Sequence, residues 1–332
     1  MIKRSQVTIT DIAKYVGMTN MTVSRALKQP EKVRPETREK ILAAANELGY
    51  VPNAFASHLR SRKNRLIGLV TASVDNPFYS EVIKAISRAA KEHDYTIMLI
   101  DTDGSPELEE VAIDTLLSYQ VAGIILSPVS DDASYRPNYL ERLRKANLPV
   151  VMLDRTLDVT DFSRVVLDNR LAGRLLGELL VNKNIERVLT LTGPSGSQIT
   201  RHRLAGLKEA YEERGVPLSL EQCPGDYTLQ PAYRDMAAHL RRGKLPDAVF
   251  GFNQLITLGA MRALHDAHVS RDDVLVVGID RPPYADIFDV SIPCAVHDTY
   301  QLGHEAFQLL FEQIKDPTTD GRELTISATL IQ

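Results

Sequence analysis

The stretch Thr8-Ile-Thr-Asp-Ile-Ala-Lys-Tyr-Val-Gly17 is followed closely by Met21-Thr-Val-Ser-Arg-Ala-Leu27, and together they decide the fold of the amino-terminal part. Each stretch carries apolar residues at helical spacing, and Thr10 and Thr19 stand where helix N-caps are expected. Gly17 permits the left-handed backbone that ends a helix. Two short helices joined by a turn of a few residues form the helix-turn-helix pattern.

A third helix is predicted from Glu36 to Leu48, opened by Pro35 and ended by Gly49. Its apolar face completes a small three-helix core. We expect this core to contain Ile12, Ala13, Val16, Val23, Leu27, Ile41 and Leu48. The following stretch, Ala54–Lys63, is too short to form a stable helix alone, so it is predicted to be a linker that orders only against a partner.

Positive charge is concentrated at the amino terminus. Residues 1–65 hold 13 Lys and Arg against 5 Asp and Glu, a net charge of +8, whereas the remainder carries a net charge of −12. A basic segment on an acidic body is typical of a DNA-binding module, because only the module lies against phosphates. An ordinary basic terminus would have the same charge, so charge alone leaves both interpretations open.

From Leu66 onward, apolar runs alternate with amphipathic helical stretches, which predicts parallel α/β sheets. The predicted strands are Leu66–Thr71, Thr96–Asp101, Gly123–Pro128, Val150–Asp154, Arg164–Leu167, Val188–Thr192, Ala248–Phe252 and Val274–Ile279. The pattern restarts at Arg164–Leu167, which indicates two similar subdomains. In such sheets ligands bind beyond the carboxyl ends of the strands, where polar residues follow most of these runs.

Other classes of protein find little support in the sequence. Cys223 and Cys294 are too few for a disulfide framework or a zinc site, and no metal or cofactor is expected. No signal peptide or membrane helix is recognisable, so we expect a cytoplasmic protein. No enzyme motif such as a P-loop, a GxGxxG fingerprint or a nucleophile elbow occurs, and the loop at residues 193–197 is a weak signal.

The chain resembles the LacI/GalR family of bacterial transcription regulators. The stretches quoted at the start carry the likeness together with Val33–Lys40, Gly49–Asn53, Asp75–Tyr79, Pro149–Arg155, Val166–Asn169, Arg203–Gly206 and Gly278–Asp280. The resemblance implies an all-α helix-turn-helix headpiece at 1–52 and a hinge helix or linker at 53–64. It also implies an α/β periplasmic-binding-protein-like core at 65–332 with two doubly wound parallel-sheet subdomains. We expect the N-subdomain at about 65–165 plus 296–324, and the C-subdomain at about 166–295 plus the C-terminal strand.

The resemblance also implies how the headpiece meets double-stranded operator DNA. The second helix lies in the major groove in this family, and two hinge helices insert a leucine into the minor groove. The residues implied in DNA binding are Thr10, Asn20, Met21, Thr22, Ser24, Arg25 and Arg34, with Asn53, Ala56 and the leucine wedge Leu59 in the hinge. Their side chains suit the task, since Asn pairs with adenine and Arg with guanine.

The core is implied to bind a small-molecule effector between its subdomains. By position, the effector-binding residues are Phe78 or Tyr79, Asp154, Arg203, Tyr227, Asn253, Gln254, Asp280 and Arg281, with Arg155 and His297 as further cationic candidates. Gln254 stands where the family commonly has Asp, and Arg281 stands where it often has Asp or Asn, which favours an anionic effector such as a sugar phosphate or a sugar acid. A neutral sugar is the alternative. Asp168 and Asn169 are expected to support structure rather than touch ligand.

The resemblance therefore predicts a repressor of carbohydrate or sugar-acid genes. Family members bind near-palindromic operators as two-fold dimers, so a homodimer is expected. Thr325–Gln332 looks like a final strand and lacks the heptad helix that makes some relatives tetramers. The effector shifts the population of DNA-binding states, and release of DNA by an inducer is favoured. A solute-binding protein would share the α/β body, but the headpiece and the missing signal peptide argue against it.

Overall fold

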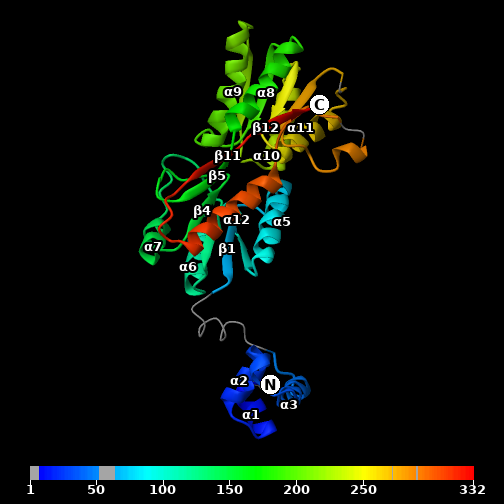
Figure 1. Cartoon of the computed structure of the whole chain (residues 1–332). Coiled ribbons are helices and arrows are strands. Elements are labelled where there is room, and N and C mark those ends of the chain that lie inside the picture. Colours follow the sequence, from blue (N-terminus) through cyan, green and yellow to red (C-terminus); the bar gives the residue numbers. More distant parts are fainter. Residues whose placement is uncertain (1–6, 52–63, 271, 289–290) are drawn as a thin grey trace. The chain divides into compact units, whose positions relative to one another are not determined.

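The computed structural model describes residues 7–51, 64–270, 272–288 and 291–332. The chain divides into two compact units, a headpiece up to Asn64 and a core from Arg65 to Gln332 (Figure 1). The hinge residues predicted from the sequence, Asn53, Ala56 and Leu59, lie outside the described residues.

The headpiece contains three α-helices around a small apolar core. They are α1 (Ile9–Val16), α2 (Asn20–Lys28) and α3 (Pro35–Glu47), with the 3₁₀ turn η1 (Pro30–Lys32) between α2 and α3. The buried residues are Ile12, Ala13, Val16, Val23, Ala26, Ile41, Ala44 and Ala45, while Leu27 and Leu48 are only partly buried. The predicted three-helix core is thus confirmed, with Ala26, Ala44 and Ala45 as additional buried residues.

The caps of α1 and α2 differ in how well the sequence predicted them. Thr8, not Thr10, caps α1: the Thr8 backbone N–H and hydroxyl donate to the Asp11 carboxylate at 2.9 and 2.7 Å, and the Asp11 N–H donates back to the Thr8 hydroxyl. The prediction for Thr10 was wrong because this reciprocal capping box starts the helix earlier. Thr19 caps α2 as predicted, accepting from the Thr22 N–H at 3.2 Å.

The first sheet of the core has six parallel strands. In spatial order they are β11 (Glu323–Ile326), β5 (Ser163–Leu167), β4 (Val150–Leu153), β3 (Gly123–Leu126), β1 (Leu66–Thr71) and β2 (Thr96–Asp101). The strand at 163–167 pairs with β4 and belongs to this sheet. The restart of the strand pattern had indicated that this strand begins the second subdomain, and that prediction was wrong.

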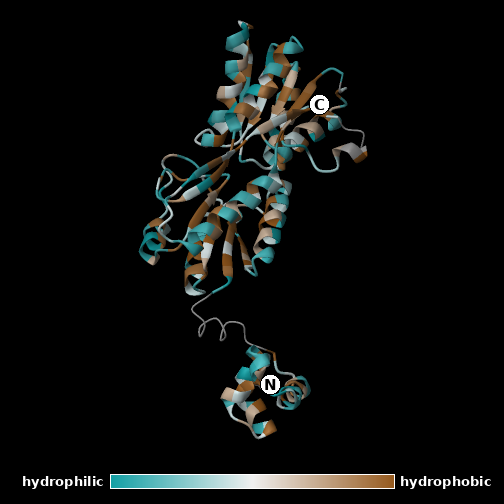
Figure 2. Ribbon diagram, in the orientation of Figure 1, coloured by the Kyte–Doolittle hydropathy of each residue, from teal (hydrophilic) through white to brown (hydrophobic). Residues whose placement is uncertain are grey.

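Alternate residues of these strands pack on opposite faces of the first sheet, as the two-residue period of a strand requires. Leu69, Ile125 and Val151 pack with α5 (Pro77–Glu92) and α12 (Thr299–Lys315). Val70, Ile124 and Met152 pack instead with α6 (Pro106–Ser118) and α7 (Tyr139–Ala146). Both faces are covered, so the inner strands β3 and β4 are apolar throughout. Figure 2 shows brown strands in the interior of the core.

The second sheet has the same order with one antiparallel edge strand. Its strands are β12 (Ala328–Ile331), β10 (Cys294–His297), β9 (Leu275–Ile279), β8 (Ala248–Gly251), β6 (Arg187–Thr192) and β7 (Ser219–Pro224). Only β12 runs antiparallel, against β10. The helices around this sheet are α8 (Asn169–Asn182), α9 (Gln198–Arg214), α10 (Leu229–Arg241) and α11 (Gln254–Asp266), and the 3₁₀ turn η2 (Ala285–Phe288) follows β9.

The chain passes between the two sheets at three places: after Leu167, after His297 and at Ser327. The predicted final strand is therefore two short strands, one in each sheet. The strands β7 and β10 and the helix α12 were not predicted. The sequence of β7 is mostly polar because it is an exposed edge strand, so it lacks the apolar run used to find the others.

Two glycines let α8 and α9 approach closely. A Cβ on Gly173 would lie 2.1 Å from the carbonyl oxygen of Arg203, and a Cβ on Gly206 would lie 2.0 Å from that of Arg170. Neither position has space for a side chain while the two helices keep this contact. This packing places Arg203 of α9 against the start of α8.

Gly173→Ala is expected to lower the free energy of unfolding by about 3 kcal/mol, because the new methyl group meets backbone that cannot rotate away. Urea denaturation of the full chain measures the change. Gly225→Ala is the control, since its Cβ would meet only the Thr192 carbonyl oxygen, at 3.2 Å. Equal losses in the two variants would contradict the packing argument.

Candidate functional site

The headpiece has a polar groove along the first two helices. It is lined by Ile9, Thr10, Asn20, Met21, Ser24, Arg25, Lys28 and Gln29. The structure thus brings together five of the residues predicted to contact DNA and adds Lys28 and Gln29. Met21 is 69% exposed, so it has no core role, whereas its neighbour Val23 is fully buried.

Hydrogen bonds fix several of these side chains before any partner binds. The Asn20 amide donates to the Thr10 hydroxyl at 3.2 Å, which joins α2 to α1. The hydroxyl of Thr22 lies 2.9 Å from that of Thr19. Thr22 and Arg34 lie outside the groove lining, and Arg34 is exposed at the start of α3. An ordered, exposed helix with a basic and amide-bearing face suits a DNA groove.

The core contains a cavity at the carboxyl ends of the strands of both sheets. It is lined by Asn76, Phe78, Tyr79, Asp154, Arg155, Leu167, Ile199, Arg203, Tyr227, Asn253, Gln254 and Asp280. In each sheet the strand order changes direction at one point. This point lies between β1 and β3 in the first sheet and between β6 and β8 in the second. Open α/β sheets bind ligands at such a switch point.

All the residues predicted to meet an effector line this cavity except Arg281 and His297. Arg281 is exposed, and His297 is buried against Asp280. The cation that does line the cavity with Arg203 is Arg155. Sequence reasoning did not find Asn76, Leu167 or Ile199. Only Asn76 carried a usable signal, as a polar residue after a strand.

Asp154 is partly buried in the cavity wall and has a left-handed backbone, with φ of 62°. Its carboxylate accepts a hydrogen bond from the Tyr79 hydroxyl at 3.0 Å, and that hydroxyl also lies 2.8 Å from the Ser127 hydroxyl. Burial raises the pKa of Asp154, although the positive charges of Arg155 and Arg203 oppose the shift. Burial likewise raises the pKa of Tyr79, which stays protonated.

Arg155 lies between the two subdomains. Its guanidinium donates to the Val129 carbonyl oxygen at 2.7 Å and lies 5.5 Å from the centre of the Tyr227 ring. Tyr227 belongs to the second subdomain, where its hydroxyl lies 2.9 Å from the Ser197 hydroxyl and 2.7 Å from that of Thr200. The cation–π contact therefore joins the two walls of the cavity.

Arg203 is held rigidly by its own subdomain. Its Nε donates to the Asn169 amide oxygen at 2.8 Å, and a terminal nitrogen donates to the Phe252 carbonyl oxygen. Asp168 caps α8 by accepting from the Leu171 N–H at 2.9 Å. Asp168 and Asn169 thus have the supporting role expected from the sequence.

The remaining polar wall presents mainly acceptors. Asn253 caps α11 and donates to the Tyr227 carbonyl oxygen at 2.8 Å, while the buried Oε1 of Gln254 has no partner among the described residues. The Asp280 carboxylate accepts from the His297 backbone N–H at 3.1 Å, and the His297 ring Nδ1 lies 3.2 Å away. Acceptors beside guanidinium groups can bind a ligand with several hydroxyls and a negative charge.

The ranges that the structure describes lack two kinds of feature. No helix there is both long and apolar enough to cross a membrane. In the same ranges, no three His, Cys, Asp or Glu side chains gather closely enough to hold a metal ion.

Comparison with known protein families gives two matches that together span almost the whole chain. Residues 8–53 match bacterial regulatory proteins of the lacI family, and residues 64–332 match the periplasmic binding proteins and sugar binding domain of the LacI family. The first match covers the headpiece helices and the second covers the core.

Relatives of full length are similar throughout. The ribose operon repressor of Halalkalibacterium halodurans is 29% identical, over 98% of this chain and 95% of its own length. The transcriptional repressor PurR of Edwardsiella ictaluri is 27% identical over the same shares, 98% and 95%. A crystal structure of the lac repressor dimer bound to operator and an anti-inducer superposes with a TM-score of 0.82, at 26% identity, over 99% of this chain and 98% of that one. These relatives are repressors, not enzymes.

The ionised carboxyl of Asp154 is expected to lower the free energy of unfolding near neutral pH, and Asp154→Asn is expected to remove this effect. Because the folded-state pKa of Asp154 is raised above its ordinary 3.8, the folded protein keeps this proton to higher pH than the unfolded chain does. The contribution of Asp154 to stability therefore falls as the pH rises through that interval. We expect the stability of the variant, relative to the wild type, to rise from about pH 4 to about pH 7 in urea denaturation.

Asp161→Asn is the control with the opposite sign. Arg144 donates to Asp161 at 2.7 Å and holds the pKa of that carboxyl below its ordinary value. Its stabilising effect is present above the unfolded pKa and is lost as the pH falls through the folded pKa. A pH-independent difference for Asp154→Asn would contradict a titrating carboxyl with a raised pKa in the cavity.

Proposed function

The chain belongs to the LacI family of bacterial regulatory proteins, and from this premise we propose that it is a transcription repressor that binds operator DNA as a dimer and is controlled by a small effector. The observation that carries the proposal is the pairing of an exposed helix-turn-helix groove with a cavity lined from two subdomains. The first feature reads DNA and the second binds the effector. A relative, the lac repressor, is a dimer on its operator, which supports the dimeric state.

The headpiece reads its operator through α2. Met21 and Arg25 are exposed on this helix, and Asn20 at its start is oriented by Thr10. Amide and guanidinium groups distinguish bases in the major groove, and a methionine methyl contacts thymine. Lys28, at the end of α2, neutralises phosphate without reading sequence. The hinge residues Asn53, Ala56 and Leu59 stay predictions, since they lie outside the described residues.

The effector is proposed to be a polyhydroxylated anion, a sugar phosphate or a sugar acid. Asp154, Asp280 and the unpartnered oxygen of Gln254 accept hydrogen bonds from hydroxyl groups, and Arg203 orients them. Arg155 supplies the positive charge that the sequence argument had assigned to Arg281. Because Arg203 is committed to Asn169 and Phe252, Arg155 is the more available cation.

A neutral sugar is the second candidate. Asp154 and Asp280 balance the two cavity arginines, so the charged side chains of the lining sum to zero formal charge at neutral pH. Paired charges of this kind bind uncharged hydroxyls through both oxygens and guanidinium nitrogens. The relative named for the ribose operon agrees with a sugar-responsive function in general.

Asn20→Ala is expected to relax the preference for particular operator bases, at a cost of about 1–3 kcal/mol in discrimination. Lys28→Ala is expected to weaken binding about equally for all sequences and to reduce the salt dependence by about one phosphate contact. Selection of bound fragments from a genomic library supplies the operator. Fluorescence anisotropy on that operator and on a scrambled duplex then measures both effects. Uniform weakening by Asn20→Ala would contradict base readout by this residue.

Arg155→Gln is expected to lower affinity for an anionic effector by about ten- to a hundredfold, because a charge-assisted hydrogen bond is lost. Isothermal titration against panels of sugar phosphates, sugar acids and neutral sugars measures the affinities. Arg281→Gln is the matched control, since it removes the same charge outside the cavity lining. Tight binding to an uncharged sugar alone would overturn the anionic assignment in favour of the second candidate.

A further inference from the structure

A loop of the first subdomain contacts the start of a helix in the second. Asp131, in the loop after β3, is only 4% exposed. Its carboxylate accepts from the Ile199 N–H at 2.9 Å and from the Ser197 hydroxyl at 3.0 Å. The Asp131 carbonyl oxygen also accepts from the Gln198 side chain at 3.0 Å. Three hydrogen bonds from one residue therefore join the subdomains.

The start of α9 is chemically suited to a carboxylate. The first N–H groups of a helix have no partner within the helix, and the helix dipole favours negative charge there. The Ser197 hydroxyl caps α9 by accepting from the Thr200 N–H at 3.3 Å, which leaves the Ile199 N–H for Asp131. Because Asp131 and Ser197 are both buried, these charge-assisted bonds are stronger than bonds exposed to water.

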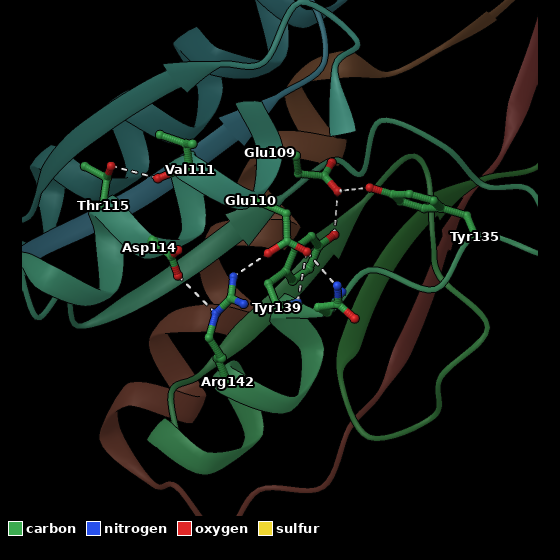
Figure 3. A network of polar contacts seen from close by, with 9 residues as sticks. Glu109, Glu110, Val111, Asp114, Thr115, Tyr135, Tyr139 and Arg142 are labelled. Carbon is green, nitrogen blue, oxygen red and sulfur yellow. Dashed lines mark hydrogen bonds and ion pairs between the residues drawn. The ribbon is translucent and has the colours of Figure 1, made fainter. Parts of the chain in front are cut away.

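The loop that carries Asp131 is held firmly by its own subdomain. The buried Glu109 carboxylate accepts from the Val129 N–H at 2.6 Å. It also accepts from the hydroxyls of Tyr135 at 2.8 Å and Tyr139 at 2.7 Å, and Figure 3 shows both tyrosines pointing toward it. Arg155 donates to the Val129 carbonyl oxygen from the other side. Asp131 therefore stands on a fixed support.

Gly196 is a second feature that depends on this contact. A Cβ at Gly196, in the second subdomain, would lie 1.7 Å from the Asp132 carboxylate of the first. Asp132 is itself tied to Ser134, accepting from its N–H at 2.7 Å and its hydroxyl at 2.6 Å. A side chain at position 196 therefore fits only if the Asp132 carboxylate leaves its hydrogen bonds to Ser134 or the subdomains separate here.

We propose that Asp131 and the start of α9 form a latch that holds the two subdomains together around the cavity in the absence of effector. The inference rests on the proposed function in taking this cavity as the effector site. The latch raises the fraction of chains already in the binding-competent arrangement, and apparent effector affinity rises in proportion to that fraction. It also occupies the amino end of α9, so an anionic group of the effector is left to Arg155.

The test perturbs the latch from both sides in the full-length chain without effector. Asp131→Ala removes the carboxylate, and Gly196→Ala introduces the clash while leaving Asp131 in place. Solution X-ray scattering gives the radius of gyration, and hydrogen exchange gives the protection of the Ile199 amide. We expect both variants to be more expanded, and exchange in Gly196→Ala to accelerate about tenfold or more. The double variant is expected to open no further than the more open single variant, since both break one contact.

Asp132→Ala is the control, because it removes the neighbouring carboxylate and keeps Asp131. It is expected to leave the radius of gyration unchanged and, combined with Gly196→Ala, to restore closure by removing the clash. An unchanged radius and unchanged exchange in both latch variants would overturn the proposal. No effector enters this experiment, so failure of the effector assignment above is a separate result.

Discussion

The three passages of the chain between the two sheets are the constraint on which the core depends. Because they follow Leu167 and His297 and fall at Ser327, neither sheet is built from a single continuous stretch. The carboxyl ends of strands from both sheets consequently line one cavity. A relative movement of the sheets must be absorbed by these short connections, which makes the cavity a natural place for a ligand to bias the arrangement of the subdomains.

The cavity tolerates buried charge because each charged group has a fixed partner. The Tyr79 hydroxyl donates to Asp154, and the His297 backbone N–H donates to Asp280. Arg203 donates to the Asn169 amide oxygen and to the Phe252 carbonyl oxygen. Burying a charge without such partners would cost several kcal/mol, on the order of a large part of a domain's stability. Among the described lining residues, the fully buried side-chain oxygen without a partner is that of Gln254, which marks where a ligand gains from a donor.

Contacts across the cavity link ligand binding to the relation between the subdomains. The cation–π contact of Arg155 with Tyr227 crosses the cavity, and the hydrogen bonds of Asp131 with the start of α9 join the same two subdomains. Glu109 and Arg155 hold the same loop through Val129. A ligand that engages Arg155 therefore acts on a side chain that also supports the loop carrying Asp131, which gives effector binding a direct physical route to closure.

Much of the fold follows from local sequence. The headpiece helices were predictable because their apolar residues recur at helical spacing, and because Gly17, Thr19 and Pro35 mark where helices end or begin. Most core strands were predictable because both faces of a buried parallel strand are apolar. The likeness to a known family then placed most of the cavity residues.

Tertiary structure alone decided that the strand at 163–167 joins the first sheet and that the last strand is divided at Ser327, because sheet membership depends on pairing partners distant in sequence. It also decided that Arg155 rather than Arg281 lines the cavity, and that Asp131 meets α9. The orientation of a loop side chain is set by the contacts around it, which no local pattern encodes.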